Sequence, residues 1–272
     1  MLPSILGYSD ESTFFGEFFG QLPFAYKGAA TLTQFTIREN INRLLQESRA
    51  DIFIGRQDTG LWKGEHPNTY TECSQIMSKG YTVGIRHLQT FDPASKKLAI
   101  DFAAAFCGEV DVHLYGTSAS KKGFGWHYDA EDVFILQIEG SKEWFFRKNT
   151  VNPWPLLETL PEDMAYRREI TPTMSCTLHP NDWLYLPVGY WHSTRAIAHS
   201  FSLSVGVNRK SCIDIYDHFR SRLLNDIRWR QRLPPDSTER PEEMKKLLEL
   251  LGEDLQRLFS HDAEVQRFFR HK

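Results

Sequence analysis

The sequence predicts a mainly β fold with flanking helices, in which antiparallel strands form a barrel and a C-terminal helical segment follows. Two apolar runs between Asp132 and Phe146 surround a Gly140-Ser141 turn, a pattern typical of a β-hairpin. The apolar stretch Asp182–Pro187 predicts a short buried strand that ends in a Pro-Val-Gly turn. With 272 residues, of which 41% are hydrophobic and 13% aromatic, the chain can bury a sizeable core.

Helices are expected on both sides of the strands. Residues 9–50 contain two apolar patterns at helical spacing, and residues 92–107 predict another helix that begins at Asp92-Pro93. Residues 56–72 predict a strand pair or a lid, and residues 149–171 a long insertion between strands. Two amphipathic patterns follow Asn208. We therefore expect a first domain over residues 1–208 and a helical region over residues 209–272.

A His-x-Asp pair and a later lone histidine suggest a metal site. In an extended strand, residues i and i+2 point to the same side, so His127 and Asp129 can both face inward. His192 follows the predicted strand 182–187 and lies 65 residues after His127. Two imidazoles and one carboxylate cover one face of an octahedral metal and leave three positions open, which suits non-heme Fe(II). The alternative is an ordinary surface pair or a hydrogen-bonded core pair.

The surrounding sequence resembles a known family. The segment Gly123–Trp144 closely resembles JmjC-type cupins, and most of all their ribosomal-oxygenase branch, whose members hydroxylate ribosomal proteins. Asn181–Ser193 is similar to the same family's closing metal segment, with Asn181 where glycine is usual. Phe18–Ala29 resembles its N-terminal entry, and the similarity spans roughly residues 14–208. The resemblance implies a double-stranded β-helix of the cupin or jelly-roll type.

The resemblance also implies roles for individual residues. His127, Asp129 and His192 match the family's iron ligands. Lys142 falls where family members bind the distal carboxylate of 2-oxoglutarate, although a lysine after a turn is more often solvated. An unpaired lysine is costly to bury, and a bound dicarboxylate would supply the missing charge. The remaining assignments are Tyr115, which would reach into the active site, and the substrate candidates His113, Ser202 and Ser204.

His113 departs from the family pattern, because family members often have asparagine at this position. It could be a fourth polar group near the metal, a substrate contact, or a core histidine with satisfied hydrogen bonds. The two serines occupy positions i and i+2 of an expected strand over residues 201–207, so both could face the barrel interior.

The function implied is an oxygenase that uses Fe(II), 2-oxoglutarate and O₂ to hydroxylate an unactivated C–H, on a protein or peptide side chain. The same chemistry on a small molecule or natural-product precursor remains an alternative. Others are a metal cupin without 2-oxoglutarate, such as an isomerase, and a non-catalytic binding module. The aspartate in the triad favours hydroxylation over halogenation, and no residue pattern supports demethylation. The sequence does not identify the substrate.

Bulk properties limit the partners and the location. The formal net charge is −3 and no long basic tract occurs, so stable nucleic-acid binding is not expected. The four cysteines are scattered without a Cys-x-x-Cys motif, which fits free thiols in a reducing compartment. No membrane-spanning run or signal peptide is apparent, so a cytoplasmic location is expected. The resemblance implies that residues 1–208 form the catalytic domain. It also implies that the helical region 209–272 serves dimerisation, giving a homodimer, or forms a reduced accessory domain.

Overall fold

The computed structural model describes residues 6–28, 37–56, 60–61, 63–119, 124–161, 166–233, 241–260 and 268. The chain divides into two compact units, Met1–Arg209 and Lys210–Lys272. In the part of the chain that the model describes, none of the helices has the length and apolar character needed to cross a membrane.

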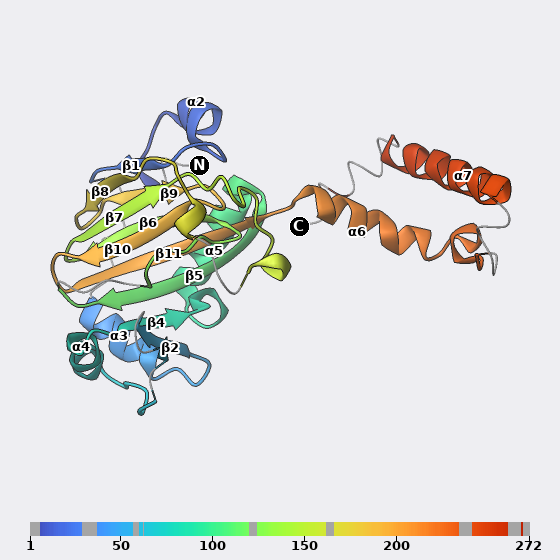
Figure 1. Ribbon diagram of the computed structural model, residues 1–272. Helices are drawn as coiled ribbons and strands as arrows, with labels where there is room; N and C mark the ends of the chain where they lie inside the picture. Colours follow the sequence, from blue (N-terminus) through green and yellow to red (C-terminus); the bar gives the residue numbers. More distant parts are fainter. Residues whose placement is uncertain are drawn as a thin grey trace. The chain divides into compact units, whose positions relative to one another are not determined.

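Two antiparallel sheets build the larger unit, and consecutive strands often belong to different sheets (Figure 1). The larger sheet has the order β1-β9-β6-β11-β5-β4-β2-β3, and the smaller sheet has the order β10-β7-β8. The larger sheet contains β1 (Phe24–Tyr26), β2 (Asp51–Arg56), β3 (Gly60–Leu61), β4 (Thr82–Arg86), β5 (Gly108–Thr117), β6 (Asp132–Glu139), β9 (Trp183–Leu186) and β11 (Ser200–Arg209). The smaller sheet contains β7 (Lys142–Arg147), β8 (Met174–Leu178) and β10 (Trp191–Ala196). The predicted double-stranded β-helix is confirmed.

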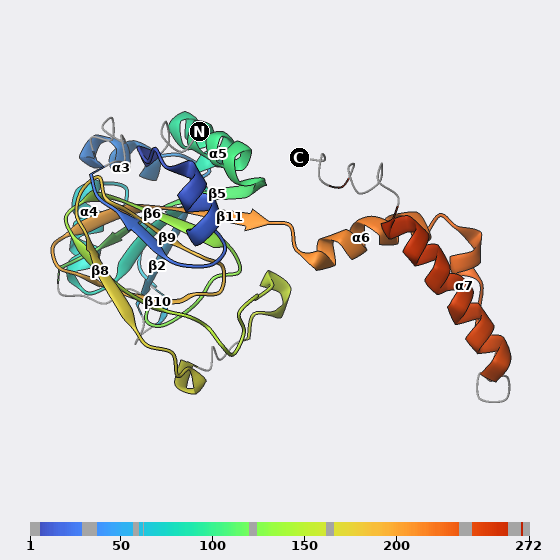
Figure 2. The same ribbon diagram turned by 90° about the horizontal axis from the view of Figure 1, so that it is seen from above.

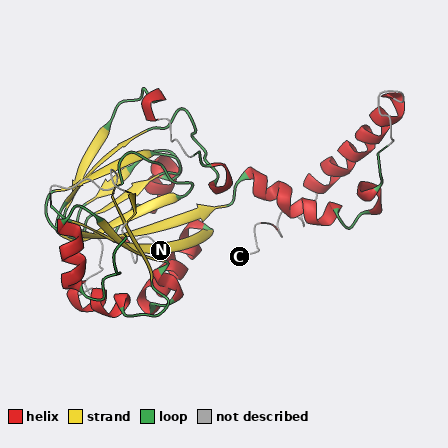
Figure 3. Ribbon diagram, turned by 60° about the horizontal axis from the view of Figure 1, so that its bottom comes forward, coloured by secondary structure: helices red, strands yellow, loops and turns green. Residues whose placement is uncertain are grey.

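Helices of the larger unit gather on one side of the strands (Figure 3). They are α2 (Glu11–Thr13), the π-helical turn η1 (Phe14–Phe18), α3 (Ile37–Leu45), α4 (Tyr70–Ser78) and α5 (Pro93–Phe106). The larger unit also contains the short 3-10 turns η2 (Leu88–Thr90), η3 (Leu157–Thr159) and η4 (Tyr166–Arg168), of which η3 and η4 belong to the insertion between β7 and β8. Asp92 caps α5 by accepting a hydrogen bond from the Ser95 amide, as the Asp-Pro start predicts. Phe106 packs on Phe134 of β6 with ring centroids 4.6 Å apart. Aromatic burial therefore fixes the helices to the outer face of the larger sheet, leaving its inner face for the site.

The predicted hairpin around Gly140-Ser141 is wrong. Strand β6 pairs with β9 and β11, whereas β7 pairs with β8 and β10, so the chain crosses between the sheets at this turn. Gly140 has a φ of 65°, and a Cβ there would collide with the carbonyl oxygen of His199. Two apolar runs joined by a short turn fit a crossing between packed sheets as well as a hairpin. The sequence pattern alone therefore does not separate the two geometries.

The structure also bears on the expectations for residues 56–72 and for Asn181. For residues 56–72 the sequence predicts a strand pair or a lid. The structure shows a strand pair at the start of this segment, where Gly55 and Arg56 of β2 pair with β3. Residues 57–59 and 62 lie outside the described residues. Asn181, which stands where the family has glycine, adopts a φ of 72°. Asparagine tolerates this left-handed conformation better than most residues, so the substitution preserves the turn before β9.

The smaller unit consists of helices, as the amphipathic patterns predict (Figure 2). It contains α6 (Cys212–Leu223), the 3-10 turn η5 (Ile227–Arg230) and α7 (Pro241–Phe259). Ser211 and Asp214 form a capping box at the start of α6. Phe219 of α6 contacts Phe259 of α7 with ring centroids 5.0 Å apart, and Arg228 forms an ion pair with Asp254 at 2.9 Å. Residues 234–240, between η5 and α7, lie outside the described residues.

Candidate active site

Backbone hydrogen bonds bring the His-x-Asp pair and the lone histidine together. The His127 amide donates to the His192 carbonyl at 3.1 Å, and the His192 amide donates to the His127 carbonyl at 2.8 Å. The Gly189 amide, in the turn between β9 and β10, donates to the Asp129 carbonyl at 3.0 Å. One nitrogen or oxygen ligand atom from each of His127, Asp129 and His192 lies within 4.8 Å of the others. The sequence therefore folds these three distant side chains into one cluster.

Hydrogen bonds to backbone carbonyls leave a lone pair on each imidazole for a metal. The Nδ1 of His127 lies 3.0 Å from the Gly125 carbonyl oxygen, and the Nδ1 of His192 lies 3.0 Å from the Tyr190 carbonyl oxygen. A carbonyl only accepts, so each Nδ1 carries the proton and each Nε2 is free to coordinate. Burial and the neighbouring His127 lower the pKa of His192, which keeps that imidazole neutral. Two neutral nitrogens and one carboxylate oxygen fit the donor set that binds Fe(II).

Lys142 lies on the wall of the same pocket, on the inward side of β7. It is 3% exposed, so the alternative of a solvated lysine is wrong. Its Nζ donates to Ser202 Oγ at 3.3 Å, and no ion pair of Lys142 occurs among the described residues. Burial lowers the pKa of Lys142 to about 8. An ammonium held at this position lacks a counter-anion, which is what a carboxylate ligand would supply.

The register of the smaller sheet sets the separation of Lys142 from the metal triad. Strand β10 pairs His192 with Phe146 and Ala196 with Lys142. Lys142 and His192 thus lie four residue positions apart along the paired strands, or about 13 Å of strand. Both side chains line the pocket between the sheets. This separation leaves room for a metal and a short dicarboxylate between them.

The opposite wall carries the other side chains that the sequence singled out. Strands β5 and β11 pair Tyr115 with Ser202 and His113 with Ser204, and all four residues line the pocket. The expectation that both serines face the interior is therefore confirmed, whereas the roles of these four residues remain predictions. The Tyr115 ring lies over Gly84 of β4, where a Cβ would come within 2.7 Å of the ring. Burial raises the pKa of Tyr115, so its hydroxyl stays protonated.

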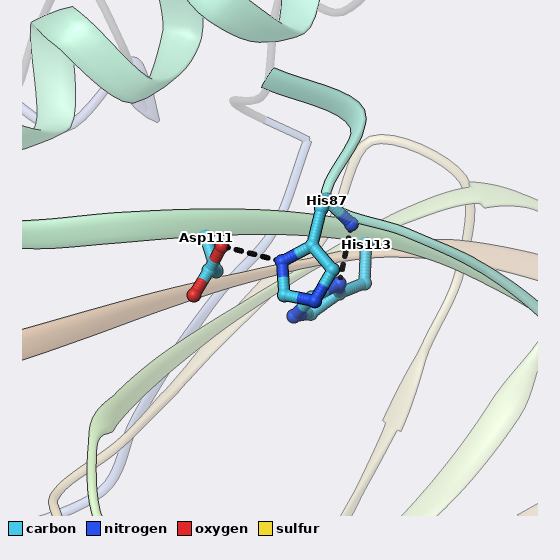
Figure 4. Close-up of side chains that lie close together, drawn as sticks. All are labelled: His87, Asp111 and His113. Atoms are coloured by element: carbon cyan, nitrogen blue, oxygen red, sulfur yellow. Dashed lines mark hydrogen bonds and ion pairs between the residues drawn. The ribbon is translucent and has the colours of Figure 1, made fainter. Parts of the chain in front are cut away.

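A second cluster of two histidines and one aspartate lies beside the pocket (Figure 4). The Nδ1 of His87 lies 2.8 Å from Asp111 Oδ1, and the His87 amide donates to the Nδ1 of His113 at 3.1 Å. A nitrogen that accepts from an amide has no proton, so the neutral His113 ring carries its proton on Nε2. Gln89 Nε2 also donates to Asp111 Oδ1. Hydrogen bonds thus occupy one nitrogen of each imidazole and one oxygen of Asp111.

For His113, the structure combines two of the open possibilities. Its Nδ1 has a hydrogen-bond partner, as in a satisfied core histidine, while the ring lines the pocket. Burial lowers the pKa of His113 to about 4, which keeps it neutral. Its Nε2–H is thereby available as a hydrogen-bond donor.

Glu131 is a pocket residue that the sequence analysis did not single out. It stands two positions after Asp129 and immediately before the buried strand β6. Burial raises the pKa of Glu131 to about 8, and the negative charges of Asp129, Asp111 and Asp132 act in the same direction. Its spacing from Asp129 was the available sequence signal, because it repeats the i, i+2 relation that unites the ligand pair. His87 and Asp111 had no comparable signal, since their cluster depends on the pairing of β4 with β5.

A family match agrees with this geometry. The model of the JmjC domain matches residues 86–215, which include the metal triad and Lys142. Residues 86–215 are thus similar to a JmjC domain. The fold also resembles the solved Escherichia coli ribosomal oxygenase YcfD in complex with cobalt and 2-oxoglutarate, with a TM-score of 0.64 and 19% identity. That alignment covers 96% of this chain and 70% of the YcfD chain, and it supports the JmjC-type fold.

Curated proteins with similar JmjC domains include two kinds of oxygenase. The bifunctional lysine-specific demethylase and histidyl-hydroxylase NO66 of Dictyostelium discoideum is 32% identical over 173 residues, which are 59% of this chain and 33% of that protein. Ribosomal oxygenase 2 of Rattus norvegicus is 33% identical over 130 residues, which are 47% of this chain and 27% of that protein. In these alignments the chain spans a third or less of each relative's length.

Proposed function

We propose that the chain is an Fe(II)- and 2-oxoglutarate-dependent oxygenase that hydroxylates an unactivated C–H of a protein or peptide side chain. The observation that carries this proposal is the joint arrangement of the metal triad and Lys142 in one pocket. The triad offers two imidazole lone pairs and a carboxylate, and Lys142 offers a buried ammonium without an ion-pair partner among the described residues. A metal cupin that does not use a dicarboxylate has no need of such a lysine.

His127 Nε2, Asp129 and His192 Nε2 would hold the iron, and Lys142 would bind the distal carboxylate of 2-oxoglutarate. When bound, the iron and 2-oxoglutarate supply the activation of O₂ for C–H oxidation. The Nδ1 hydrogen bonds to the Gly125 and Tyr190 carbonyls orient the two imidazoles toward the metal. Ser202 positions the Lys142 ammonium, and the protonated Tyr115 offers a hydrogen-bond donor beside it. The protein's part is therefore to orient ligands and to exclude water.

A protein substrate is supported by the relatives' names and by the surface of this chain. Ribosomal oxygenases and histidyl-hydroxylases are named for protein targets. Among its described residues, the insertion between β7 and β8 exposes large apolar side chains, with exposed fractions of 80% for Trp154, 70% for Leu157 and 87% for Ile170. Exposed apolar side chains of this size are suited to contact with a polypeptide.

A succinate-release assay tests the proposed reaction. The purified chain is incubated with Fe(II), 2-oxoglutarate and a panel of ribosomal proteins, peptides and small metabolites. Mass spectrometry then searches each candidate for the gain of one oxygen atom. We expect a hydroxylated polypeptide whose formation requires both Fe(II) and 2-oxoglutarate. Hydroxylation of a metabolite alone would retain the chemistry and replace the substrate class. A protein that binds neither iron nor 2-oxoglutarate would contradict the proposal.

We further propose a catalytic domain over residues 1–208, a homodimer formed by the helical region 209–272, and a cytoplasmic location. The helices of that region expose apolar side chains, among them Ile213 and Tyr216 on α6 and Leu248 and Leu250 on α7. Light scattering after size-exclusion chromatography tests the dimer, and Ile213→Asp should convert it to a monomer. A monomeric wild type would contradict this assignment. All four cysteines are free, which supports a reducing compartment.

A further inference from the structure

The pocket has two charged ends, and the proposed function uses only one of them. Strand β11 places Ser202, Ser204 and Gly206 at alternate positions, which share one face of the sheet. Lys142 contacts Ser202 at one end of this row. The carboxylate of Glu131 lies over Gly206 at the other end, where a Cβ would overlap it. The two contact points are four residue positions apart, or about 13 Å of strand.

We propose that Glu131 is a specificity-determining residue that binds an ammonium or guanidinium group of the substrate. This assignment rests on the proposed function only in treating the bound cation as part of a substrate. The carboxylate would receive the cationic group at the Gly206 end of the pocket, while 2-oxoglutarate occupies the Lys142 end. The substrate would then enter with its charge directed away from the Lys142 ammonium.

The first support is that the Glu131 carboxylate lines the pocket and has no partner. Among the described residues, no hydrogen bond or ion pair involves Glu131, although it is largely buried. A carboxylate held away from bulk water without a partner is costly, and a ligand that supplies N–H donors removes that cost. By contrast, the other acidic side chains of this region have partners, since Asp111 accepts from His87 and Gln89, and Asp132 accepts from Tyr185.

The second support is the sign of the surrounding charge. The acidic residues that line the described pocket are Asp129 and Glu131, and a metal held by Asp129 would leave Glu131 as the carboxylate available to a substrate. Lys142 is the one lysine or arginine among the residues that line the described pocket, and it lies at the opposite end. A cation is therefore attracted to the Glu131 end, whereas a second anion would be repelled.

The third support is that the strand leaves room for this side chain. Gly206 pairs with Asp111 of β5 and with Val133 of β6, in the interior of the larger sheet. Glycine weakens a strand interior, so its presence there often marks a close approach by another group. Here the approaching group is the Glu131 carboxylate. Any larger residue at position 206 would displace the carboxylate from this end of the pocket.

Titration with a matched pair of small ligands tests the assignment. The probes are n-butylguanidinium and its neutral analogue n-butylurea, and calorimetry measures their dissociation constants for the full chain. The titrations are made with metal-free protein and again with Co(II) and 2-oxoglutarate. We expect the wild type to bind the guanidinium about tenfold more tightly than the urea, as a charge-assisted hydrogen bond provides. Glu131→Gln should reduce this ratio to about one.

Two further variants distinguish loss of the cation site from loss of the folded structure. Glu143→Gln removes the same charge from β7 outside the pocket, where Glu143 pairs with Arg195, and should keep the tenfold preference. Gly206→Ala retains Glu131 but displaces its carboxylate, and should weaken the preference while circular dichroism stays unchanged. A wild type without preference for the guanidinium, or a preference that survives Glu131→Gln, would overturn the proposal.

The same experiment distinguishes this proposal from the proposed function. Loss of Co(II) binding in Glu131→Gln would overturn the proposal by making Glu131 a metal ligand. If the wild type binds neither Co(II) nor 2-oxoglutarate yet prefers the guanidinium through Glu131, the oxygenase assignment fails and the cation site stands. If both ligands bind and the cation preference is absent, the oxygenase assignment stands and the cation site fails.

Discussion

Two clusters in this chain contain the same residue types and differ in their hydrogen bonds. His127, Asp129 and His192 form one, and His87, Asp111 and His113 form the other, and in each the candidate ligand atoms lie within 4.8 Å of one another. In the first cluster, both Nδ1 atoms donate to backbone carbonyls, so both Nε2 atoms keep a lone pair, and the His192 Nε2 lies 3.4 Å from Asp129 Oδ2. In the second, one Nδ1 lies against Asp111 and the other accepts a backbone amide.

This difference indicates that proximity of ligand types does not define a metal site. A metal needs lone pairs, and the groups around the ligands decide which atoms keep them. The second cluster instead joins β4 and β5 and fixes the tautomer of His113, whose ring lines the pocket. We propose that the first cluster binds the catalytic metal and that the second cluster forms part of the pocket wall.

The largest expected effect is on turnover. His127→Ala and Asp129→Ala should reduce 2-oxoglutarate-dependent succinate release to background, because each removes a ligand that the metal needs. His87→Ala should keep turnover within about threefold of the wild type, since it alters only the hydrogen-bonded cluster. Undiminished turnover in either triad variant would refute the assignment of these ligands.

The next largest effect is on 2-oxoglutarate binding. Lys142→Met should weaken 2-oxoglutarate by roughly 10- to 100-fold, because it removes a buried charge-assisted hydrogen bond. Calorimetry on Co(II)-loaded protein measures the loss, and Arg195→Met, which removes a cation from an exposed ion pair, is the control. Equal affinity in Lys142→Met and wild type would show that another group holds the dicarboxylate.

The same substitution should stabilise the unliganded fold. The pKa of Lys142 is lowered from 10.5 to about 8 by burial, so charging it costs up to about 3 kcal/mol in the folded state. Because the folded pKa lies below the unfolded one, this penalty is fully present below pH 8 and disappears as the pH rises to 10.5. Urea unfolding should therefore favour Lys142→Met at pH 7, with a difference that narrows above pH 8. A less stable variant at pH 7 would contradict the cost assigned to the buried ammonium.

A smaller effect is expected on the pH dependence of the dissociation constant of 2-oxoglutarate. The dicarboxylate binds the protonated lysine, so its dissociation constant should rise as the pH increases above about 8. A rise of a few fold per pH unit is expected in the wild type and should be absent in Lys142→Met. A pH profile that is identical in the two proteins would exclude Lys142 as the titrating anchor.

The smallest effect belongs to the second cluster. His87→Ala should lower the free energy of unfolding by about 1 kcal/mol, since it removes the hydrogen bond from His87 to Asp111. The backbone amide that binds His113 survives this substitution, so the pocket wall should remain. Chemical denaturation measures the change, and a loss of several kcal/mol would mean that this cluster carries more of the fold than its hydrogen bonds indicate.

Much of the site was accessible from sequence because its parts have local signatures. The His-x-Asp pair, the strand before His192 and the lysine at position 142 were each recognisable from spacing and from the family resemblance. The interior positions of Ser202 and Ser204 followed from strand alternation. These features depend on residues that are neighbours along the chain.

The remainder depended on which strands lie side by side. The hairpin at Gly140 was predicted wrongly, because a turn between apolar runs does not reveal whether the strands pair or cross between sheets. The His87 cluster requires the pairing of β4 with β5, and the position of Glu131 requires Gly206 on a strand 75 residues further along the chain. Contacts of this kind arise from tertiary packing rather than from local pattern.

Titration with Co(II) tests the central comparison most directly. Absorption spectroscopy would follow binding to the wild type, His192→Ala and His87→Ala, with 2-oxoglutarate absent. We expect one bound Co(II) in the wild type and in His87→Ala, and affinity at least about 100-fold weaker in His192→Ala. Co(II) binding that survives in His192→Ala and is lost in His87→Ala would place the metal in the other cluster and contradict the account.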